Sequence, residues 1–275
     1  VIDVAGGEPR ALTTGAGEAG VTRGLAEFVA QKEMDRREGF WWSPDGSKLA
    51  FAEVDERRIP VYRIVHQGKD EVIEEAHRYP FAGQENAIVR LAVVTVATGE
   101  VTWMNVSVGG PGASYEYLAR VKWLPTGELV AQVEDRRQQR LDMIKFDPQT
   151  GQGAPLLHEA SRDWINLHDM FHPLPADYAL EPGGFIWASE RTGFRHLWLL
   201  DRNGRPSRAL TEGEWPVESL AGVDEARGIA YFVGAADGPT ERQLYRVALA
   251  GGKPQRITRA AGWHTVTLDK ACRRF

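Results

Sequence analysis

Charged side chains gather between Gly24 and Arg37, and they could take part in chemistry. The stretch Gly24-Leu-Ala-Glu-Phe-Val-Ala-Gln-Lys-Glu-Met-Asp-Arg-Arg37 carries Glu27, Lys32, Glu33 and Asp35, and Glu38 follows it. A carboxylate at the mouth of a pocket could bind a cation such as an ammonium group. The alternative is a solvated face of an amphipathic helix, and position in the chain does not decide between the two.

Two histidines four residues apart, His168 and His172, have the spacing with which one helix face can hold a metal. The general-base glutamate of a zinc-protease motif is missing from this stretch. Structural or surface histidines are therefore favoured, and we predict neither a metal site nor a cofactor.

The sequence contains no nucleophile motif that would support acyl transfer. It has no Gly-x-Ser-x-Gly elbow, and the Gly-rich segment at residues 109–114 opens no predicted helix. Cys272 is the only cysteine, so it can form no internal disulfide, and we expect it to be a free surface thiol. No catalytic residue is predicted in this chain.

The composition is that of a globular protein, with 43% hydrophobic residues and a net charge of −5. A nucleic-acid-binding domain usually has a basic face, so this charge argues against nucleic acid as a partner. No apolar stretch approaches the length of a membrane span, and no signal peptide opens the chain. The compartment, periplasmic or cytoplasmic, is left open.

The elements that must position these residues are predicted from a phrase that recurs five times. Each copy is an apolar alternating strand, a turn with glycine and a second strand that often closes on Leu-Thr or Ile-Thr. The copies are residues 1–13, 91–106, 141–157, 197–211 and 244–258. A repeat of roughly 40–50 residues built from short strands is typical of a β-propeller.

A further strand pair accompanies most copies, most clearly Phe40 to Phe51, where Ser-Pro-Asp-Gly supplies the turn. Two stretches break the rhythm. Residues 24–37 have helical spacing, and the polar insertion from Asp55 to Asn86 fits the tendency of insertions to map to one face, often the binding face.

The predicted fold class is therefore all-β, an incomplete β-propeller of about four to five blades with one short inserted helix. We expect Val1 to Val4 to be the interior of a strand and residues 265–275 to open another repeat. Both ends then predict a fragment of a longer protein, with residues 1–275 forming a partial propeller domain.

Several segments resemble one family in order along the chain. They are Phe40-Trp-Trp-Ser-Pro-Asp-Gly-Ser-Lys-Leu-Ala-Phe-Ala52, Arg78-Tyr-Pro-Phe-Ala-Gly-Gln-Glu-Asn86, Ser189-Glu-Arg-Thr-Gly-Phe-Arg-His-Leu197 and Leu210-Thr-Glu-Gly-Glu-Trp-Pro-Val217. Together they resemble the propeller domain of the dipeptidyl peptidase IV family. With a single cysteine, the chain is more similar to bacterial members.

The resemblance implies an eight-bladed propeller over an α/β-hydrolase domain that carries Ser, Asp and His and follows the propeller in sequence. That catalytic domain is absent from this chain. The implied activity is release of N-terminal dipeptides with Pro or Ala in second place. The implied partners are a peptide with a free N-terminus and the chain's own hydrolase domain, with a homodimer as an option.

In the family, a short inserted helix carries a Glu-Glu pair that binds the α-amine of the substrate. The resemblance places this pair on Lys32 and Glu33, so a lysine replaces the first glutamate. Lys32 could neutralise Glu33 and repel an ammonium, or it could turn outward and leave Glu33 to act alone. The arginine that assists the pair in the family falls before residue 1.

Two other functions remain open from the sequence. One is a non-catalytic propeller that binds a protein partner, which Lys32 favours. The other is a related exopeptidase with a different N-terminal preference. The inserted helix and the Tyr-Pro-x-Ala-Gly-x-x-Asn element favour the dipeptidyl peptidase.

Overall fold

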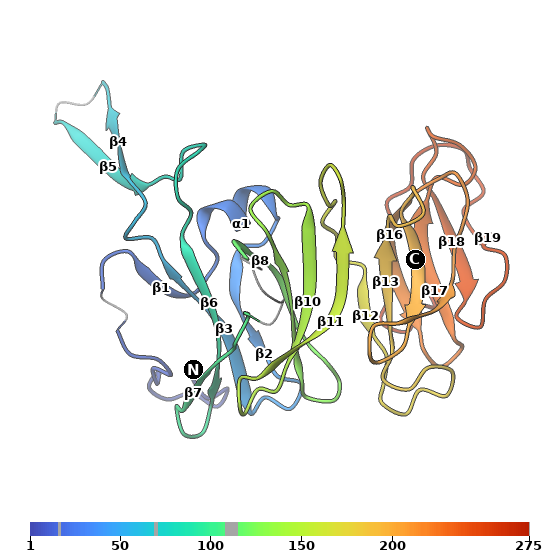
Figure 1. Cartoon of the computed structure of the whole chain (residues 1–275), viewed down its shortest axis with the longest axis horizontal. Helices are drawn as coiled ribbons and strands as arrows, with labels where there is room; N and C mark the ends of the chain where they lie inside the picture. Colours follow the sequence, from blue (N-terminus) through green and yellow to red (C-terminus); the bar gives the residue numbers. More distant parts are fainter. Residues whose placement is uncertain (16–17, 69–70, 108–114, 275) are drawn as a thin grey trace. The chain divides into compact units, whose positions relative to one another are not determined.

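The computed structural model of the chain describes residues 1–15, 18–68, 71–107 and 115–274 (Figure 1). It divides into two compact units, Val1–Ile165 and Asn166–Phe275, and each is described by itself. The Gly-rich segment 109–114 lies outside the described residues.

The first unit contains two antiparallel sheets and a separate hairpin. The first sheet has the order β1-β2-β3-β6-β7, and the second has the order β11-β10-β9-β8. The strands of the first sheet are β1 (Val21–Leu25), β2 (Glu38–Trp42), β3 (Lys48–Asp55), β6 (Ile88–Thr95) and β7 (Val101–Trp103). Those of the second are β8 (Tyr117–Trp123), β9 (Leu129–Glu134), β10 (Arg140–Phe146) and β11 (Gly153–Ala160).

Alternation along these strands buries one apolar set between the two sheets. Ala50 and Val93 from the first sheet belong to one core cluster with Leu129 and Phe146 from the second. The indole Nε1 of Trp123 donates a hydrogen bond of 2.9 Å to the carbonyl oxygen of Trp41 and so links the sheets. Because side chains alternate between the two faces of a sheet, this register fixes which residues face the core.

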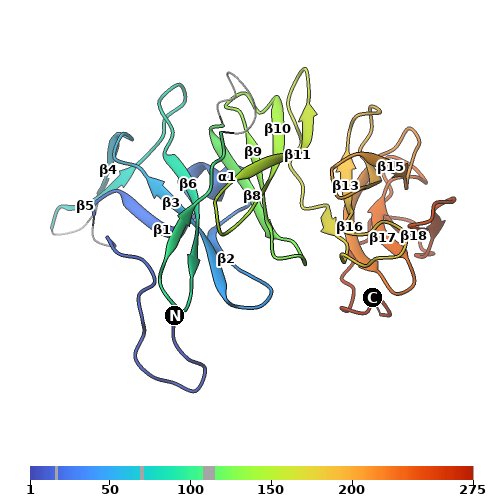
Figure 2. The same ribbon diagram turned by 60° about the horizontal axis from the view of Figure 1, so that its bottom comes forward.

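A hairpin fills the insertion between β3 and β6. Its strands β4 (Val61–His66) and β5 (Ile73–Arg78) pair only with each other and extend away from the two sheets (Figures 1 and 2). Every residue of β4 is exposed, including Tyr62 and Val65. The sequence indicated a polar insertion here and gave no sign of the hairpin.

The second unit contains two four-stranded antiparallel sheets, β12-β13-β14-β15 and β16-β17-β18-β19. Ile186 and Leu199 of the first share a core cluster with Phe232 and Val247 of the second. The strands are β12 (Phe171–Pro173), β13 (Phe185–Ser189), β14 (His196–Leu200), β15 (Pro206–Ala209), β16 (Val217–Asp224), β17 (Ile229–Gly234), β18 (Gln243–Ala248) and β19 (Gln255–Arg256).

The all-β prediction is confirmed, since all named strand pairs are antiparallel and the one described helix, α1 (Phe28–Glu33), has six residues. Four of the five repeat phrases form the expected strand pairs. The first is wrong, because residues 1–13 form no strand and Val1 and Arg10 only exchange two backbone hydrogen bonds. Among the described residues no sheet edge pairs with that segment, and an isolated strand pair is marginal in water.

Two further expectations are wrong. The described residues from Ile257 onward form no strand, so the strand expected at residues 265–275 is not formed over 265–274. Cys272 is buried against Tyr231 and Leu244 rather than exposed, and this burial raises the pKa of its thiol. Among the described residues the strands form five sheets, and none closes into a ring.

Candidate functional site

The segment that carries the candidate residues is the loop between two paired strands. β1 and β2 pair at Gly24↔Gly39 and Leu25↔Glu38, and residues 26–37 connect the two strands. A Cβ on Gly39 would lie 2.5 Å from the carbonyl oxygen of Leu25, so only glycine allows the two backbones to approach this closely. The strand pair thus fixes where the loop begins and ends.

Within this loop, α1 spans Phe28–Glu33, which is shorter than the predicted 24–37. Residues 24 and 25 belong to β1, and Asp35 has φ of +51°, a left-handed conformation that ends the helical path. A helix of six residues is not stable in isolation. Packing holds α1 instead, since Ala30 and Met34 are almost completely buried.

A buried ion pair ties the two ends of the loop together. Nη2 of Arg36 donates to Oε2 of Glu27 over 2.9 Å, and Nη1 of Arg36 donates to the carbonyl oxygen of Glu38 over 3.0 Å. The two side chains are only 6% and 5% exposed. Burial lowers the pKa of the Arg36 guanidinium, and the Glu27 carboxylate opposes that shift. Glu27 is therefore not part of a solvated face.

Lys32 and Glu33, the two residues predicted from the resemblance, are the last two residues of α1, and both are exposed. They line one hollow of about 590 Å³. Its lining consists of Gln31, Lys32, Glu33, Asp35 and Arg37. The structure thus brings together three of the charged residues singled out from the sequence, and it adds Arg37.

The Tyr-Pro-x-Ala-Gly-x-x-Asn element lies next to α1. The ring of Tyr79 meets Phe28 of α1 edge-on, with the centroids 4.9 Å apart, and Phe81 packs 4.8 Å from Tyr79. Asn86 at the end of the element donates to Oε1 of Glu116 over 3.0 Å. The most family-specific motif in the sequence therefore supports the loop that carries Lys32 and Glu33.

Sequence reasoning missed a second buried carboxyl in the first unit. Glu134, at the end of β9, is fully buried, and neither of its carboxyl oxygens has a hydrogen-bond partner among the described residues. Burial raises the pKa of Glu134 to about 7; the Asp135 charge acts in the same direction, and Arg120 opposes it. Every residue of β9 is buried, so the strand does not alternate between buried and exposed positions. The sequence pattern therefore does not mark Glu134 as a buried carboxyl.

His168 and His172 lie in the second unit and contact other partners. Nε2 of His168 is 2.9 Å from the carbonyl oxygen of Ala188, and Nε2 of His172 is 2.9 Å from Oε1 of Glu225. The described residues contain no group of three or more His, Cys, Asp or Glu side chains that could hold a metal ion. The preference for structural histidines agrees with these contacts.

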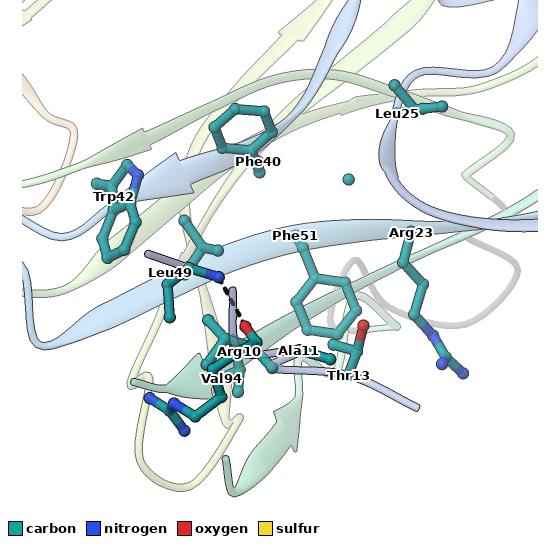
Figure 3. A pocket seen from close by; sticks show the side chains of 13 residues that line it. Arg10, Ala11, Thr13, Arg23, Leu25, Phe40, Trp42, Leu49, Phe51 and Val94 are labelled. Carbon is teal, nitrogen blue, oxygen red and sulfur yellow. Dashed lines mark hydrogen bonds between the residues drawn. The ribbon is translucent and has the colours of Figure 1, made fainter. Parts of the chain in front are cut away.

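A second hollow, of about 430 Å³, lies on the outer face of the first sheet (Figure 3). Phe40 and Trp42 from β2 and Leu49 and Phe51 from β3 line it, and the segment around Arg10 borders it. Phe40 and Trp42 are 42% and 47% exposed. This face can bind apolar groups, and its described lining contains no carboxylate, histidine or cysteine side chain.

Comparison with known proteins now identifies the family. The model for the dipeptidyl peptidase IV (DPP IV) N-terminal region matches residues 1–275. The chain belongs to this family.

The chain is 29% identical to dipeptidyl peptidase 8 of Mus musculus and 28% identical to that of Homo sapiens. Each match covers 90% of this chain and 35% of the relative. It is also similar to the crystal structure of Porphyromonas gingivalis dipeptidyl peptidase 4, with a TM-score of 0.83 and 25% identity over 95% of this chain and 36% of that one. The chain thus spans about a third of the length of these dipeptidyl peptidases.

The family assignment confirms the resemblance inferred from the sequence, and the members it matches are peptidases. Among the described residues, no helix of this DPP IV N-terminal region is long and apolar enough to cross a membrane.

Proposed function

We propose that this chain is the propeller domain of a serine exopeptidase, where it gates substrate access and recognises the free N-terminal amine. The enzyme would release N-terminal dipeptides of the Xaa-Pro or Xaa-Ala type. The chain would supply no catalytic residue, and a following α/β-hydrolase domain would carry the triad. Membership of the DPP IV N-terminal region family supports this proposal.

One observation carries the amine-recognition role. Glu33 is an exposed carboxylate in a hollow, and the loop that presents it is fixed by the buried Glu27–Arg36 pair and the close Gly39 contact. A fixed carboxylate at a set distance from a nucleophile would measure two residues from a free amine. A charge-assisted contact of this kind contributes about 1.5–3 kcal/mol.

Lys32 weakens this recognition in our proposal, because its ammonium group competes with the substrate amine for Glu33. The test uses the full-length protein and Gly-Pro and Ala-Pro amide substrates. We expect Glu33→Ala to lower kcat/KM at least tenfold, since about 1.4 kcal/mol of lost transition-state binding gives that factor. Lys32→Glu should raise kcat/KM on these substrates. If kcat/KM of Glu33→Ala were unchanged, Glu33 would not bind the substrate amine, and the exposed residues of α1 would be only a solvated helix face.

The alternative is a non-catalytic propeller that binds a protein partner. The exposed Phe40 and Trp42 beside the 430 Å³ hollow favour it, because exposed apolar patches often mark binding surfaces. Turnover of substrates with a free or an acetylated N-terminal amine distinguishes the two proposals. Acetylating the substrate amine should abolish turnover by the peptidase, whereas a protein-binding module would release no dipeptide from either substrate.

A further inference from the structure

The hollow at α1 carries charges of both signs. Among the described residues that line it, Lys32 and Arg37 are cationic, Glu33 and Asp35 are anionic, and Gln31 is neutral. Within the described part of the chain, none of these four charged side chains forms an ion pair. The hollow therefore has no net formal charge and two unpaired groups of each sign.

The backbone beneath these groups is fixed. Met34 and Arg36 are 2% and 7% exposed and alternate with the exposed Glu33, Asp35 and Arg37. The N–H of Arg36 donates to the carbonyl oxygen of Ala30 over 3.0 Å, which requires the left-handed turn at Asp35. A sparsely populated backbone conformation held by buried neighbours is common at binding sites. The charged side chains are thus presented from a rigid support and stay available to a ligand.

A ligand with one group of each sign matches such a hollow better than a simple cation. A peptide with a neutral first residue brings only its ammonium group, which Glu33 attracts and Lys32 repels. A first residue with a side-chain carboxylate brings both charges on one unit. Lys32 and Glu33 both line the hollow, so a ligand that occupies it can meet an opposite charge for each of its two groups.

We propose that the hollow selects peptides whose N-terminal residue is acidic. Glu33 binds the α-ammonium group, and Lys32 binds the side-chain carboxylate of the first Asp or Glu. Arg37 adds positive potential to the carboxylate position, and Asp35 adds negative potential to the amine position. This inference rests on the proposed amine recognition and names the substrate class of that same site. Peptides that begin with Lys or Arg are disfavoured, because they bring two cations.

The test compares chromogenic Asp-Pro, Asn-Pro and Gly-Pro amides with the full-length protein. Asp and Asn have nearly the same shape, so the ratio of their kcat/KM values isolates the carboxylate charge. We expect a ratio of about ten in the natural protein, falling as ionic strength rises because exposed charges are screened. Lys32→Glu should bring the ratio to one or below while raising turnover of Gly-Pro.

A matched control is Lys253→Glu, which makes the same charge change at an exposed lysine that does not line the hollow. It should leave the Asp-to-Asn ratio unchanged. A ratio near one in the natural protein would overturn the acidic preference. Amine recognition would then still stand if Glu33→Gln lowered kcat/KM on all three substrates. If Glu33→Gln changed none of them, or if no substrate were turned over, both proposals would fall.

Discussion

Replacing Arg36 by methionine should loosen the loop that presents Glu33. Arg36 and Glu27 are 6% and 5% exposed, so removing the guanidinium leaves the Glu27 carboxylate buried without its partner. Breaking a buried ion pair from one side costs about 3–5 kcal/mol. The six residues of α1 cannot compensate, because they supply few helical hydrogen bonds of their own.

The loss of stability should be measurable in the loop itself, at residues 26–37. The amide of Gln31 donates to the carbonyl oxygen of Glu27, and the amide of Met34 donates to that of Ala30. Hydrogen exchange of a peptide covering residues 26–37 measures the free energy of opening this loop. Each ~1.4 kcal/mol changes the equilibrium constant for opening tenfold. Arg36→Met should therefore speed hydrogen exchange by roughly two to four powers of ten, up to the limit set by global unfolding.

Two further variants test the cause. Glu27→Gln combined with Arg36→Met removes both buried charges, so it should restore much of the protection against hydrogen exchange. In the natural protein Oε1 of Glu27 and Nε of Arg36 lack partners among the described residues, so the pair does not fully compensate the desolvation of its charges. Arg63→Met breaks an exposed pair with Glu74 and should cost at most about 1 kcal/mol. If Arg36→Met changed exchange in this loop by less than threefold, the buried pair would not hold α1.

Two other outcomes follow from the same unit. The raised pKa of Glu134 means that the folded state holds this proton more tightly than the unfolded state, so stability is lost as pH rises from about 4.5 to about 7. Glu134→Gln should therefore gain up to about 3 kcal/mol in unfolding free energy at pH 8 and almost nothing at pH 4, which urea titrations at the two pH values can measure. Gly39→Ala should cost about 1–3 kcal/mol, because its Cβ would overlap the Leu25 backbone. Unchanged thermal unfolding of that variant would contradict the close approach.

The strand pairs were predictable because their signals are local. Alternation and a turn glycine specify β2–β3 around Gly46 and β10–β11 around Gly151, and both glycines have positive φ. The first copy of the phrase has the same pattern but forms no strand, because a strand also needs a partner edge. The hairpin β4–β5 was missed for the opposite reason, since its residues are all exposed or nearly so and show no buried alternation.

The candidate site was only half predictable. Lys32 and Glu33 were named through the family resemblance, and the structure places them in one hollow. The burial of Glu27 was missed, although a signal existed. Glu27, Ala30 and Met34 are spaced three and four residues apart, which places all three on one helical face. The partner Arg36 could not be predicted, because the left-handed turn at Asp35 sets its direction.

These features argue against a plain solvated face at α1. A solvated face needs no buried charge pair, because the desolvation of such a pair is costly. The Glu27–Arg36 pair is present here, in the same loop as the side chains that form no ion pairs within the described part of the chain. Natural proteins break local rules of stability at functional sites and compensate for this elsewhere. The loop from Ala26 to Arg37 breaks one of these rules, and the charges it leaves without ion pairs are those that we assign to an acidic N-terminal residue.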